Sequence, residues 1–379
     1  LTQSWGQLNK QAAAGIDGIS IAKYKSKLPE NIQRLTHQLR NKSFRANDIK
    51  RVFIPKANGK QRPLGLPTID DKLVQQGVSQ ILQNIWEQDF LPNSYGYRPN
   101  KSAHKAIHSL RLNLQFKGYG YIVEADIKGF FDNMNHDWLM KMLEQRIDDK
   151  SLLGLIKQWL KARIKSPDGC FNKPESGTPQ GGVISPVLAN IYLHYALDLW
   201  FEKTVKPRMK GRAMLIRYAD DFVVAFQYGI DADNFYRVLP KRLNKFGLSV
   251  APEKTHLKRF SRFLPGHKRN FQFLGFEFYW SLDANKKPIV RRYTAPKKLK
   301  AAMSEFYRWI KFNRSRPLKE TMPILKRKLM GFQNYFGLPD NSRSLSRLSH
   351  YVSRTLFKWL NRRSQRRSYN WSSFTDMLG

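Results

Sequence analysis

The stretch MLIRYADDFVVAF, residues 214–226, places two adjacent acids, Asp220 and Asp221, between two apolar runs. Each run is long enough for a buried β-strand, and the short polar interruption is typical of a turn between paired strands. We therefore predict a β-hairpin with both carboxylates at its tip. Neighbouring negative charges repel each other, so their place in this hairpin needs a physical reason.

A third acid stands in a similar position on another predicted strand. Asp126 ends the apolar stretch GYIVEADI, residues 120–127, directly before Lys128 and Gly129. If the two strands are neighbours, three carboxylates meet at one edge of a sheet, where repulsion resists their joint ionisation. A divalent metal ion reverses that problem, because carboxylate oxygens suit Mg²⁺ that is shared with substrate phosphates. Two such ions ~4 Å apart can activate an attacking hydroxyl and stabilise a leaving pyrophosphate.

An alternative to a metal site exists for each acidic position taken alone, namely an ordinary surface turn. Surface turns are rich in aspartate, and an isolated Asp-Asp pair usually marks a solvated loop. The long apolar runs that precede both acidic positions make two solvated turns a poor explanation, so the pattern favours a metal site.

The charge balance points to a polyanionic partner. The chain has 379 residues, with 67 Lys and Arg against 29 Asp and Glu, which gives a formal net charge of +38. Such an excess favours nucleic acid over an anionic membrane. No apolar run approaches the ~18 residues that a membrane-spanning helix needs, so we expect no membrane partner. The single cysteine, Cys170, excludes an internal disulfide and fits an intracellular, cytoplasmic protein.

Two helical stretches bear on the domain organisation. One begins near Asp70, which we predict to be its N-cap, and its apolar face comprises Val74, Val78, Ile81, Leu82 and Ile85. The other lies in residues 291–379, which hold 21 Lys and Arg and 4 Asp and Glu. Its helical stripe, formed by Leu345, Leu348, Val352, Leu356 and Leu360, predicts a folded basic domain and not a flexible tail.

Several blocks of the sequence, in a fixed order, resemble those of reverse transcriptases. The resemblance is strongest to group II intron-encoded (maturase-type) reverse transcriptases and their bacterial relatives. The blocks are GIDGIS, FIPKANGKQRPLGLPTIDDKLVQ, YGYRPNKSAHKAI, ADIKGFFDNMNHDWL, GTPQGGVISPVLANIYL, YADD, GLSVAPEKT, FQFLGFEF, LKRKLMGFQNYFG and FKWLNRRSQRRSYNWSSF. They cover nearly the whole chain from about Gly15.

The resemblance implies an α+β fold of the right-hand polymerase type, with an antiparallel palm sheet and a helical thumb. The expected division is fingers at 1–75 and 134–184, palm at 76–133 and 185–290, and a basic maturase-type thumb at 291–379.

The resemblance also assigns roles around the acids. It makes Asp126, Asp220 and Asp221 the catalytic ligands of two Mg²⁺ ions, for which Mn²⁺ can substitute. Phe131 resembles the bulky gate beneath the sugar 2′ position, where an aromatic ring excludes a ribonucleotide hydroxyl; core packing is its alternative role. Lys254, in APEKT, resembles a lysine proposed to protonate the departing pyrophosphate, which is reasonable chemistry for an ammonium.

Other roles concern substrate binding. Lys56 and Arg62, on either side of a predicted turn at Asn58-Gly59, resemble residues that clamp the incoming triphosphate, with a generic basic surface as the alternative. Gln180, in the loop TPQGG, resembles a residue that contacts the incoming nucleotide near its sugar. The predicted primer grip, whose alternative is an ordinary buried strand, comprises Phe273, Leu274, Gly275 and Phe276.

The function implied first is RNA-directed DNA polymerisation: extension of a DNA or RNA primer with dNTPs on an RNA template. Two alternatives stay open, namely a maturase that binds structured intron RNA and assists splicing, and a reverse transcriptase associated with CRISPR or phage defence. The intact acids favour retained polymerisation. The chain as given reaches Gly379 without a DNA-binding or endonuclease region after the thumb, so we expect no target cleavage of its own.

Overall fold

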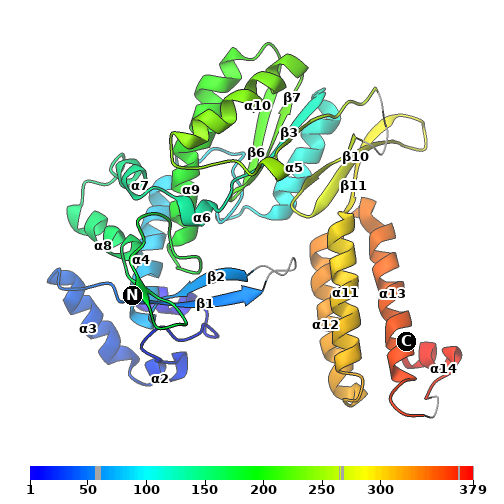
Figure 1. Cartoon of the computed structure of the whole chain (residues 1–379), viewed down its shortest axis with the longest axis horizontal. Coiled ribbons are helices and arrows are strands. Elements are labelled where there is room, and N and C mark those ends of the chain that lie inside the picture. The colour runs from blue at the N-terminus through cyan, green and yellow to red at the C-terminus, as the bar shows by residue number, and fades with distance from the viewer. Residues whose placement is uncertain (56–60, 264, 266–268, 366–367, 379) are drawn as a thin grey trace. The chain divides into compact units, whose positions relative to one another are not determined.

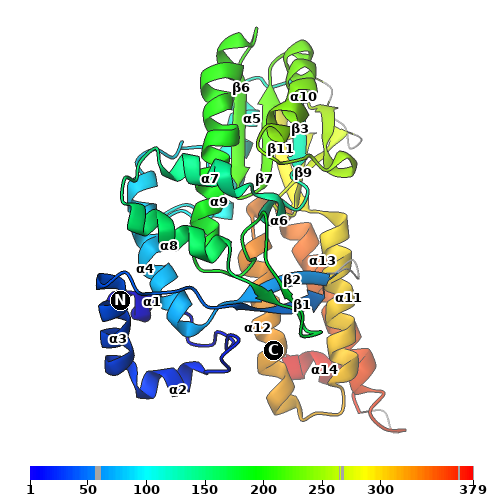
Figure 2. The same cartoon turned by 60° about the vertical axis from the view of Figure 1, so that its left-hand side comes forward.

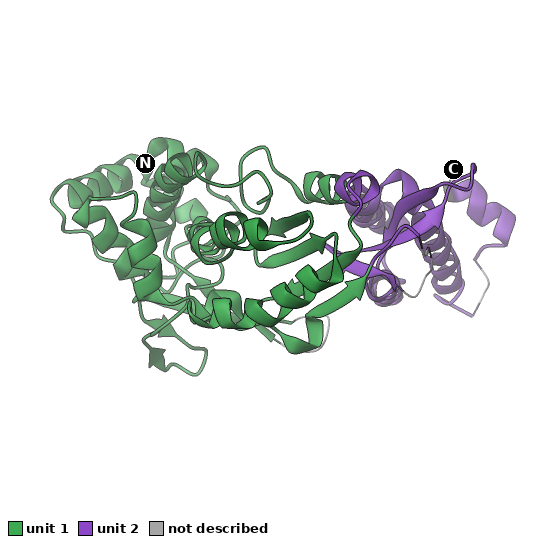
Figure 3. Cartoon of the chain, turned by 90° about the horizontal axis from the view of Figure 1, so that it is seen from above, with its two compact units in different colours: residues 1–110, 119–259 green, residues 111–118, 260–379 purple. Residues whose placement is uncertain are grey.

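The structure is a computed structural model of the whole chain. It describes residues 1–379 except 56–60, 264, 266–268, 366–367 and 379. The chain folds into two compact units, coloured separately in Figure 3: unit 1 comprises Leu1–Leu110 with Tyr119–Arg259, and unit 2 comprises Arg111–Gly118 with Phe260–Gly379. Each is described by itself.

The predicted hairpin of residues 214–226 lies in the central sheet of unit 1 and is confirmed. Four antiparallel strands form this sheet in the order β6-β7-β3-β8. Their bounds are β3 (Tyr121–Asp126), β6 (Ala213–Tyr218), β7 (Asp221–Phe226) and β8 (His256–Arg259). The expected neighbourhood of the two acidic strands is therefore also confirmed, because β3 pairs directly with β7.

Helices cover this sheet and connect it to the rest of unit 1. The helix α10 (Gly229–Asn244) packs on β3, β7 and β8, and Figure 1 shows it beside β3 and β7. The helix α9 (Ser185–Leu193) continues into two π-helical turns, His194–Asp198 and Phe201–Val205, and then into a 3₁₀ turn, Lys206–Arg208.

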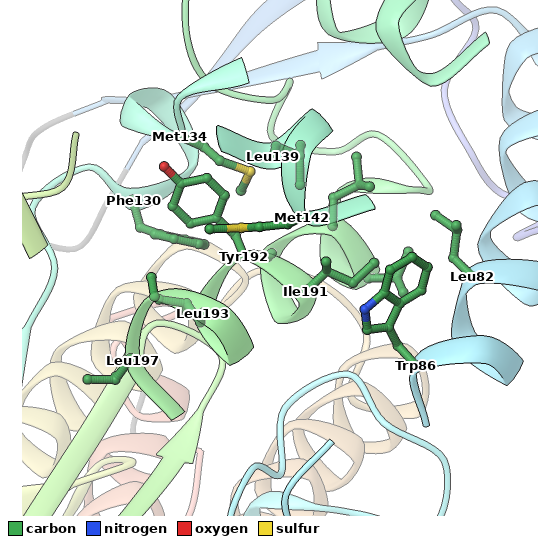
Figure 4. Close-up of a cluster of buried hydrophobic side chains, with 14 of the residues drawn as sticks. Leu82, Trp86, Phe130, Met134, Leu139, Met142, Ile191, Tyr192, Leu193 and Leu197 are labelled. Atoms are coloured by element: carbon green, nitrogen blue, oxygen red, sulfur yellow. The ribbon is translucent and has the colours of Figure 1, made fainter. Parts of the chain in front are cut away.

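A buried apolar cluster joins α9 to its neighbours, as Figure 4 shows. It combines Ile191, Tyr192 and Leu193 of α9 with side chains from α4 (Ile69–Trp86), α6 (Phe130–Asn133) and α7 (His136–Leu143). Tyr192 and Trp86 are completely buried, and full burial of an aliphatic neighbour such as Ile191 or Leu193 stabilises the fold by roughly 1.5–3 kcal/mol. The cluster fixes α6, which carries Phe131, against α9.

The start of α4 corrects one prediction. The N-cap is Thr68, whose hydroxyl accepts a hydrogen bond from the Asp71 backbone N–H, so the prediction of Asp70 is wrong. Asp70 lies in the first turn and pairs instead with the guanidinium of Arg34 at 2.8 Å. Val74, Val78 and Leu82 of the predicted apolar face are buried, as predicted. Ile81 is 49% exposed, because the buried face is centred instead toward Leu73 and Trp86.

A second sheet of unit 1, in the order β2-β1-β4-β5, presents the predicted basic hairpin. Its strands are β1 (Ile49–Pro55), β2 (Gln61–Leu66), β4 (Ile164–Lys165) and β5 (Phe171–Asn172). Figure 2 shows β1 and β2 side by side, and their register pairs Pro55 with Gln61. The strands on either side of the predicted turn are thus confirmed, whereas Lys56 and the turn itself lie outside the described residues. The remaining helices of this unit are α1 (Thr2–Gln7), α2 (Ile21–Ser26), α3 (Leu28–Arg40) and α8 (Lys150–Leu160), with a 3₁₀ turn at Pro252–Lys254.

Unit 2 joins a small antiparallel sheet to a helical bundle. The strands β9 (Phe271–Phe273), β10 (Phe276–Leu282) and β11 (Pro288–Thr294) have the order β11-β10-β9. The helices are α11 (Pro296–Phe312), α12 (Leu318–Phe336), α13 (Ser342–Leu360) and α14 (Trp371–Leu378), with a 3₁₀ turn at Pro339–Asn341. The helix α5 (Ala103–Phe116) runs from unit 1 into unit 2. The leucine-rich stripe predicted for α13 is confirmed, since Leu348, Val352, Leu356 and Leu360 are buried.

Among the described residues, no helix combines the length and apolar character that crossing a membrane requires.

Candidate active site

The turn between β6 and β7 brings three aspartates to one end of the central sheet. Tyr218 pairs with Asp221, so the turn consists of only two residues, Ala219 and Asp220. Ala219 has a φ of 56°, in the left-handed region that residues with a side chain rarely adopt. In the neighbouring pair of strands Asp126 stands directly opposite Asp221, and opposed residues project to the same face of a sheet. The predicted meeting of three carboxylates at one edge is thus present.

Burial and charge work against ionisation of Asp220. Its removal from water raises the pKa of the carboxyl, and the nearby charge of Asp126 raises it further. The cationic groups of Arg62 and Lys254 oppose this rise. Arg62 belongs to β2, so the basic hairpin of the second sheet acts electrostatically on the acids of the first.

Lys254 lies beside the acids, on the 3₁₀ turn that precedes β8. Its ammonium donates a hydrogen bond to Oδ2 of Asp126 at 2.6 Å, and this contact raises the pKa of Lys254. The Lys254 side chain is 62% exposed, so water reaches the pair. The backbone supports the arrangement, because Ala251 N–H donates to the Asp126 carbonyl at 2.8 Å.

The donor set fits a divalent cation in its chemistry. Three carboxylates at one strand edge provide hard oxygen ligands, and a bound cation would offset the burial and the charge repulsion that raise the pKa of Asp220. The side chains are not gathered into a finished coordination sphere, since the described residues contain no group of three or more His, Cys, Asp and Glu placed to hold a metal. Lys254 partly neutralises Asp126 in this arrangement.

Phe131 and Gln180 line one pocket of about 120 Å³. Phe131 lies five residues after Asp126, on the short helix α6, and Gln180 belongs to the loop before α9. The Gln180 side chain donates to the Asp132 carboxylate at 3.3 Å, and the Gln180 carbonyl accepts from the Gly65 N–H at 2.7 Å. The loop at 177–182 is thereby fastened to β2, the strand that carries Arg62.

The glycines of that loop allow the close approach. Gly181 has a φ of 106°, and a Cβ there would lie 2.9 Å from the Gly65 carbonyl oxygen. Gly177, with a φ of 83°, would place a Cβ 2.7 Å from the Phe131 carbonyl oxygen. Side chains at either position would push the loop away from the pocket.

The residues of the predicted primer grip form a tight turn in unit 2. Phe273 pairs with Phe276, and between them Leu274 and Gly275 have positive φ values of 49° and 80°. Both phenylalanines are buried, and Phe276 packs against Phe336 of α12. The Tyr335 hydroxyl donates to the Leu274 carbonyl at 2.9 Å. The Gly275 carbonyl also accepts a hydrogen bond, from the Ala295 N–H at 2.9 Å, so the turn is held through its backbone.

Sequence reasoning missed the buried polar group behind the acidic turn. Arg217 and Asp198 form a salt bridge of 2.6 Å with both side chains completely buried. The signal was available, because Arg217 interrupts the apolar run of LIRYADD, and a charged side chain in a buried strand requires a partner. The identity of that partner was not available, because Asp198 is 19 residues away and its place depends on a π-helical turn.

Comparison with known proteins agrees with this geometry. Residues 54–278 match the family described as reverse transcriptase (RNA-dependent DNA polymerase), which spans more than half of the chain. Residues 297–374 match the group II intron, maturase-specific domain. The two matched regions contain, respectively, the three aspartates and the helical bundle of unit 2.

Two bacterial relatives illustrate the sequence likeness. Protein YkfC of Escherichia coli is 34% identical over 238 residues, which is 55% of this chain and 62% of YkfC. The group II intron-encoded protein LtrA of Lactococcus lactis is 41% identical over 166 residues, 44% of this chain and 27% of LtrA. The chain therefore aligns with less than two thirds of the length of each of these relatives.

A solved structure gives the likeness in fold. Telomerase from Candida albicans, solved with a telomeric RNA fragment, superposes with a TM-score of 0.50 and 14% identity, covering 94% of this chain and 67% of that one. At this identity the match concerns the fold alone, and it agrees with the predicted α+β right-hand polymerase architecture. The match over residues 54–278, more than half of the chain, shows that the chain belongs to the reverse transcriptase family, and the match over residues 297–374 adds the group II intron, maturase-specific domain.

Proposed function

We propose that this chain is an RNA-directed DNA polymerase that extends a primer 3′-hydroxyl with dNTPs on an RNA template. The observation that carries the proposal is the register of β3 and β7, which sets Asp126 opposite Asp221 with Asp220 in the adjoining turn. Members of this family use divalent metal ions. We assign Asp126, Asp220 and Asp221 as the ligands of two Mg²⁺ ions, with Mn²⁺ as a substitute.

When bound, such ions supply positive charge that activates the attacking hydroxyl and stabilises the leaving pyrophosphate. The protein's own cations would act around them. Arg62 offers a guanidinium fork for the triphosphate, and we assign Lys56 to the same task. Lys254 is protonated and exposed, so its ammonium can turn from Asp126 to donate a proton to the pyrophosphate.

The pocket beside Phe131 and Gln180 would receive the sugar of the incoming nucleotide. Phe131 lines it from α6 and Gln180 from the opposite loop, which supports their assignment as sugar gate and nucleotide contact. We expect Phe131→Ala to raise incorporation of rNTPs relative to dNTPs, because the ring no longer occupies the space of a 2′-hydroxyl. Competition between the two nucleotides on one template measures this ratio, and an unchanged ratio would show that the ring is not the gate.

The division of labour follows the family pattern. We propose fingers at 1–75 and 134–184, a palm at 76–133 and 185–290 and a thumb at 291–379. The turn at 273–276 would hold the primer end through its backbone. With RNA and dNTPs as substrates, we place the activity in the cytoplasm of a bacterial cell.

Primer extension tests the proposal directly. Wild type and Asp220→Ala are compared on an RNA template with a DNA primer in Mg²⁺, and template–primer binding is measured for both. We expect cDNA from wild type and equal binding but no extension from the variant. A wild type that binds RNA tightly yet extends no primer would contradict the polymerase assignment.

A second function, RNA binding that assists intron splicing, is favoured by a cationic cluster in unit 2. Four cationic groups lie within 6 Å of the Trp359 ring centroid: Lys311 at 5.5 Å, Arg314 at 5.4 Å, Lys358 at 5.8 Å and Arg362 at 5.9 Å. Within the described part of the chain none of the four forms a salt bridge. Mutual repulsion in such a cluster is relieved by a phosphate backbone.

This function is tested without polymerisation. We expect the double variant Lys311→Ala, Arg314→Ala to bind structured intron RNA more weakly and with a shallower salt dependence, by about one unit of slope per lost phosphate contact. The exposed pair Lys23 and Lys25, on α2 in unit 1, provides a control of equal charge. Equal RNA binding by both double variants would remove this cluster from the RNA-binding surface.

A further inference from the structure

We propose that Arg217 is a positioning residue that, clamped by Asp198 and Asn190, holds the Ala219–Asp221 turn in the conformation that binds metal. The inference deepens the proposed polymerase function and rests on it. Arg217 touches neither substrate nor the reacting atoms; its role is to fix the backbone that carries the acids.

The guanidinium of Arg217 makes four hydrogen bonds, to three partners. Nε and Nη2 donate to the two carboxylate oxygens of Asp198 at 2.9 Å and 2.6 Å. Nη1 donates to the side-chain oxygen of Asn190 and to the carbonyl oxygen of Ala219, both at 3.0 Å. The last of these contacts is to the turn itself, because Ala219 lies between the strand that carries Arg217 and the catalytic candidate Asp220.

The hydrogen bond to the Ala219 carbonyl is made at the residue of the turn whose backbone conformation is the least favourable. Ala219 lies at a φ of 56° and is buried, so the turn conformation is one that the residue does not select by itself. A hydrogen bond from a charged donor to the Ala219 carbonyl stabilises this conformation in a site with little water. The orientation of the next residue, Asp220, follows from that of the peptide.

A local irregularity in the helix after α9 makes the clamp possible. Asn190 and Asp198 are eight residues apart, and at roughly 100° per residue an α-helix would separate their directions by about 80°. The π-helical turn at His194–Asp198, where Leu199 N–H donates to the His194 carbonyl, absorbs one extra residue. The separation then falls to roughly 20°, so both side chains reach the same guanidinium.

Asn190 also ties a third segment to the turn. Its side-chain N–H donates to the Gly96 carbonyl at 2.7 Å, while Tyr95 N–H donates to the Arg217 carbonyl at 2.8 Å. A Cβ on Gly96 would lie 2.3 Å from the Ala219 nitrogen, so only glycine permits this approach. The turn is thus enclosed by β6, α9 and the segment around Gly96.

The decisive variant is Arg217→Lys, which keeps the charge but loses the fork. One ammonium cannot serve Asp198, Asn190 and the Ala219 carbonyl together. We expect the Mg²⁺ concentration for half-maximal primer extension to rise about tenfold or more, the range seen when groups that orient metal ligands are lost. Template–primer affinity and the KM for dNTP at saturating Mg²⁺ are expected to stay as in wild type.

A second readout does not depend on activity. Binding of Mn²⁺ alone to the full chain, followed by electron paramagnetic resonance, is expected to weaken by a similar factor in Arg217→Lys. The matched control is Arg292→Lys, which breaks an equally bidentate pair with Asp340 in unit 2 and is expected to leave Mn²⁺ binding unchanged. If Arg217→Lys does not fold, Asn190→Ala removes one partner of the fork and is measured in its place.

The outcomes separate the inference from the function on which it rests. A folded Arg217→Lys or Asn190→Ala protein with wild-type Mn²⁺ affinity and wild-type Mg²⁺ dependence would overturn the positioning role, even with an active polymerase. A weakened Mn²⁺ affinity shared equally by Arg292→Lys would also overturn it, because the effect would then follow from lost stability. A wild type that binds Mn²⁺ but extends no primer would overturn the proposed function and leave the positioning role to be judged by metal binding.

Discussion

Two ion pairs beside the same turn have equal lengths and opposite surroundings. Behind the turn, Arg217 and Asp198 are 2.6 Å apart and both 0% exposed. In front of it, Lys254 and Asp126 are also 2.6 Å apart, but their side chains are 62% and 28% exposed. The Arg217–Asp198 pair is shielded from water and hydrogen-bonded, whereas the exposed Lys254–Asp126 pair can separate at a small cost in free energy.

The difference indicates which side of the site is fixed and which is exchangeable. A buried, hydrogen-bonded pair resists rearrangement, since each separated charge would be left in an apolar interior. A solvated pair is weak and gives way to a competing ion. We interpret the Arg217 side as the support for the turn, and the Lys254 side as the surface where metal and substrate would replace the ammonium.

Removing one partner from each pair tests this contrast with the largest effects. We expect Asp198→Ala to lower the free energy of unfolding by roughly 3–5 kcal/mol, because Arg217 keeps a buried charge without its counterion. Lys254→Met is expected to change it by no more than about 1 kcal/mol, as for other exposed pairs. Chemical denaturation of both variants measures the difference.

A double variant sharpens that result. In Asp198→Leu with Arg217→Met both charges are gone, and the expected loss is smaller than for Asp198→Ala. Equal losses for Asp198→Ala and Lys254→Met would show that the two pairs do not differ as their burial indicates.

Local signals were sufficient for the front of the site. The apolar runs around Asp220 and before Asp126 predicted the strands, and the short turn predicted the pairing of β6 with β7. The pairing of β3 with β7, which the sequence left open, comes from the structure. Lys254 and Gln180 were located through family blocks and do lie in unit 1 beside the features expected of them. Their chemical roles stay predictions.

The buried pair of Arg217 and Asp198 could not be predicted from the local sequence pattern. Asp198 reaches Arg217 only because a π-helical turn shifts the helix phase, and no periodicity of apolar residues reports such an insertion. The N-cap of α4 was missed for a related reason. Thr68 and Asp70 are both good capping residues, and the partners of the Asp70 carboxylate, Tyr24 and Arg34, are 46 and 36 residues away in the sequence.

Adding a methyl group at Gly96, which lies against the Ala219–Asp220 turn, tests how rigid the turn is. A Cβ added at Gly96 would lie 2.3 Å from the Ala219 nitrogen, and both atoms belong to backbone. We expect Gly96→Ala to cost about 1–3 kcal/mol of stability and to reduce primer extension, because the turn must move. Gly154→Ala is the control, since a Cβ there meets nothing within 4 Å and a helical alanine stabilises by roughly 0.5–1 kcal/mol. Wild-type activity in Gly96→Ala would show that the turn tolerates displacement.

At Asp220, in contrast, we expect a substitution that abolishes function to raise the stability of the metal-free protein. Burial raises the pKa of Asp220 above 3.8, so between the ordinary and the raised value the native state binds more protons than the unfolded state. Stability therefore falls as pH rises through that interval, and the deficit persists at neutral pH. We expect metal-free Asp220→Asn to have a higher Tm than wild type at pH 7 while extension is lost.

Metal addition completes this test. In chelator the Asn variant is the more stable protein, and added Mg²⁺ should raise the Tm of wild type more than that of the variant, because binding to the native state stabilises it. A lower Tm for metal-free Asp220→Asn at pH 7 would contradict the view that this carboxylate is held at a cost to folding.

The smallest effect belongs to His194, on the π-helical turn behind the site. It is 2% exposed, packs edge-on against Phe90 at 5.5 Å, and burial lowers its pKa below 6.5. As pH falls below 6.5, His194 takes up a proton in the unfolded chain but not yet in the native state. The free energy of unfolding therefore decreases between pH 6.5 and the lowered pKa of the native state. We expect His194→Phe to flatten this acid limb, measured as Tm from pH 7.5 to 5, whereas a change at exposed His108 to Gln should leave the limb in place. An acid limb in His194→Phe as steep as in wild type would show that the π-helical turn admits water and a proton, and that the back of the site is less closed than its contacts indicate.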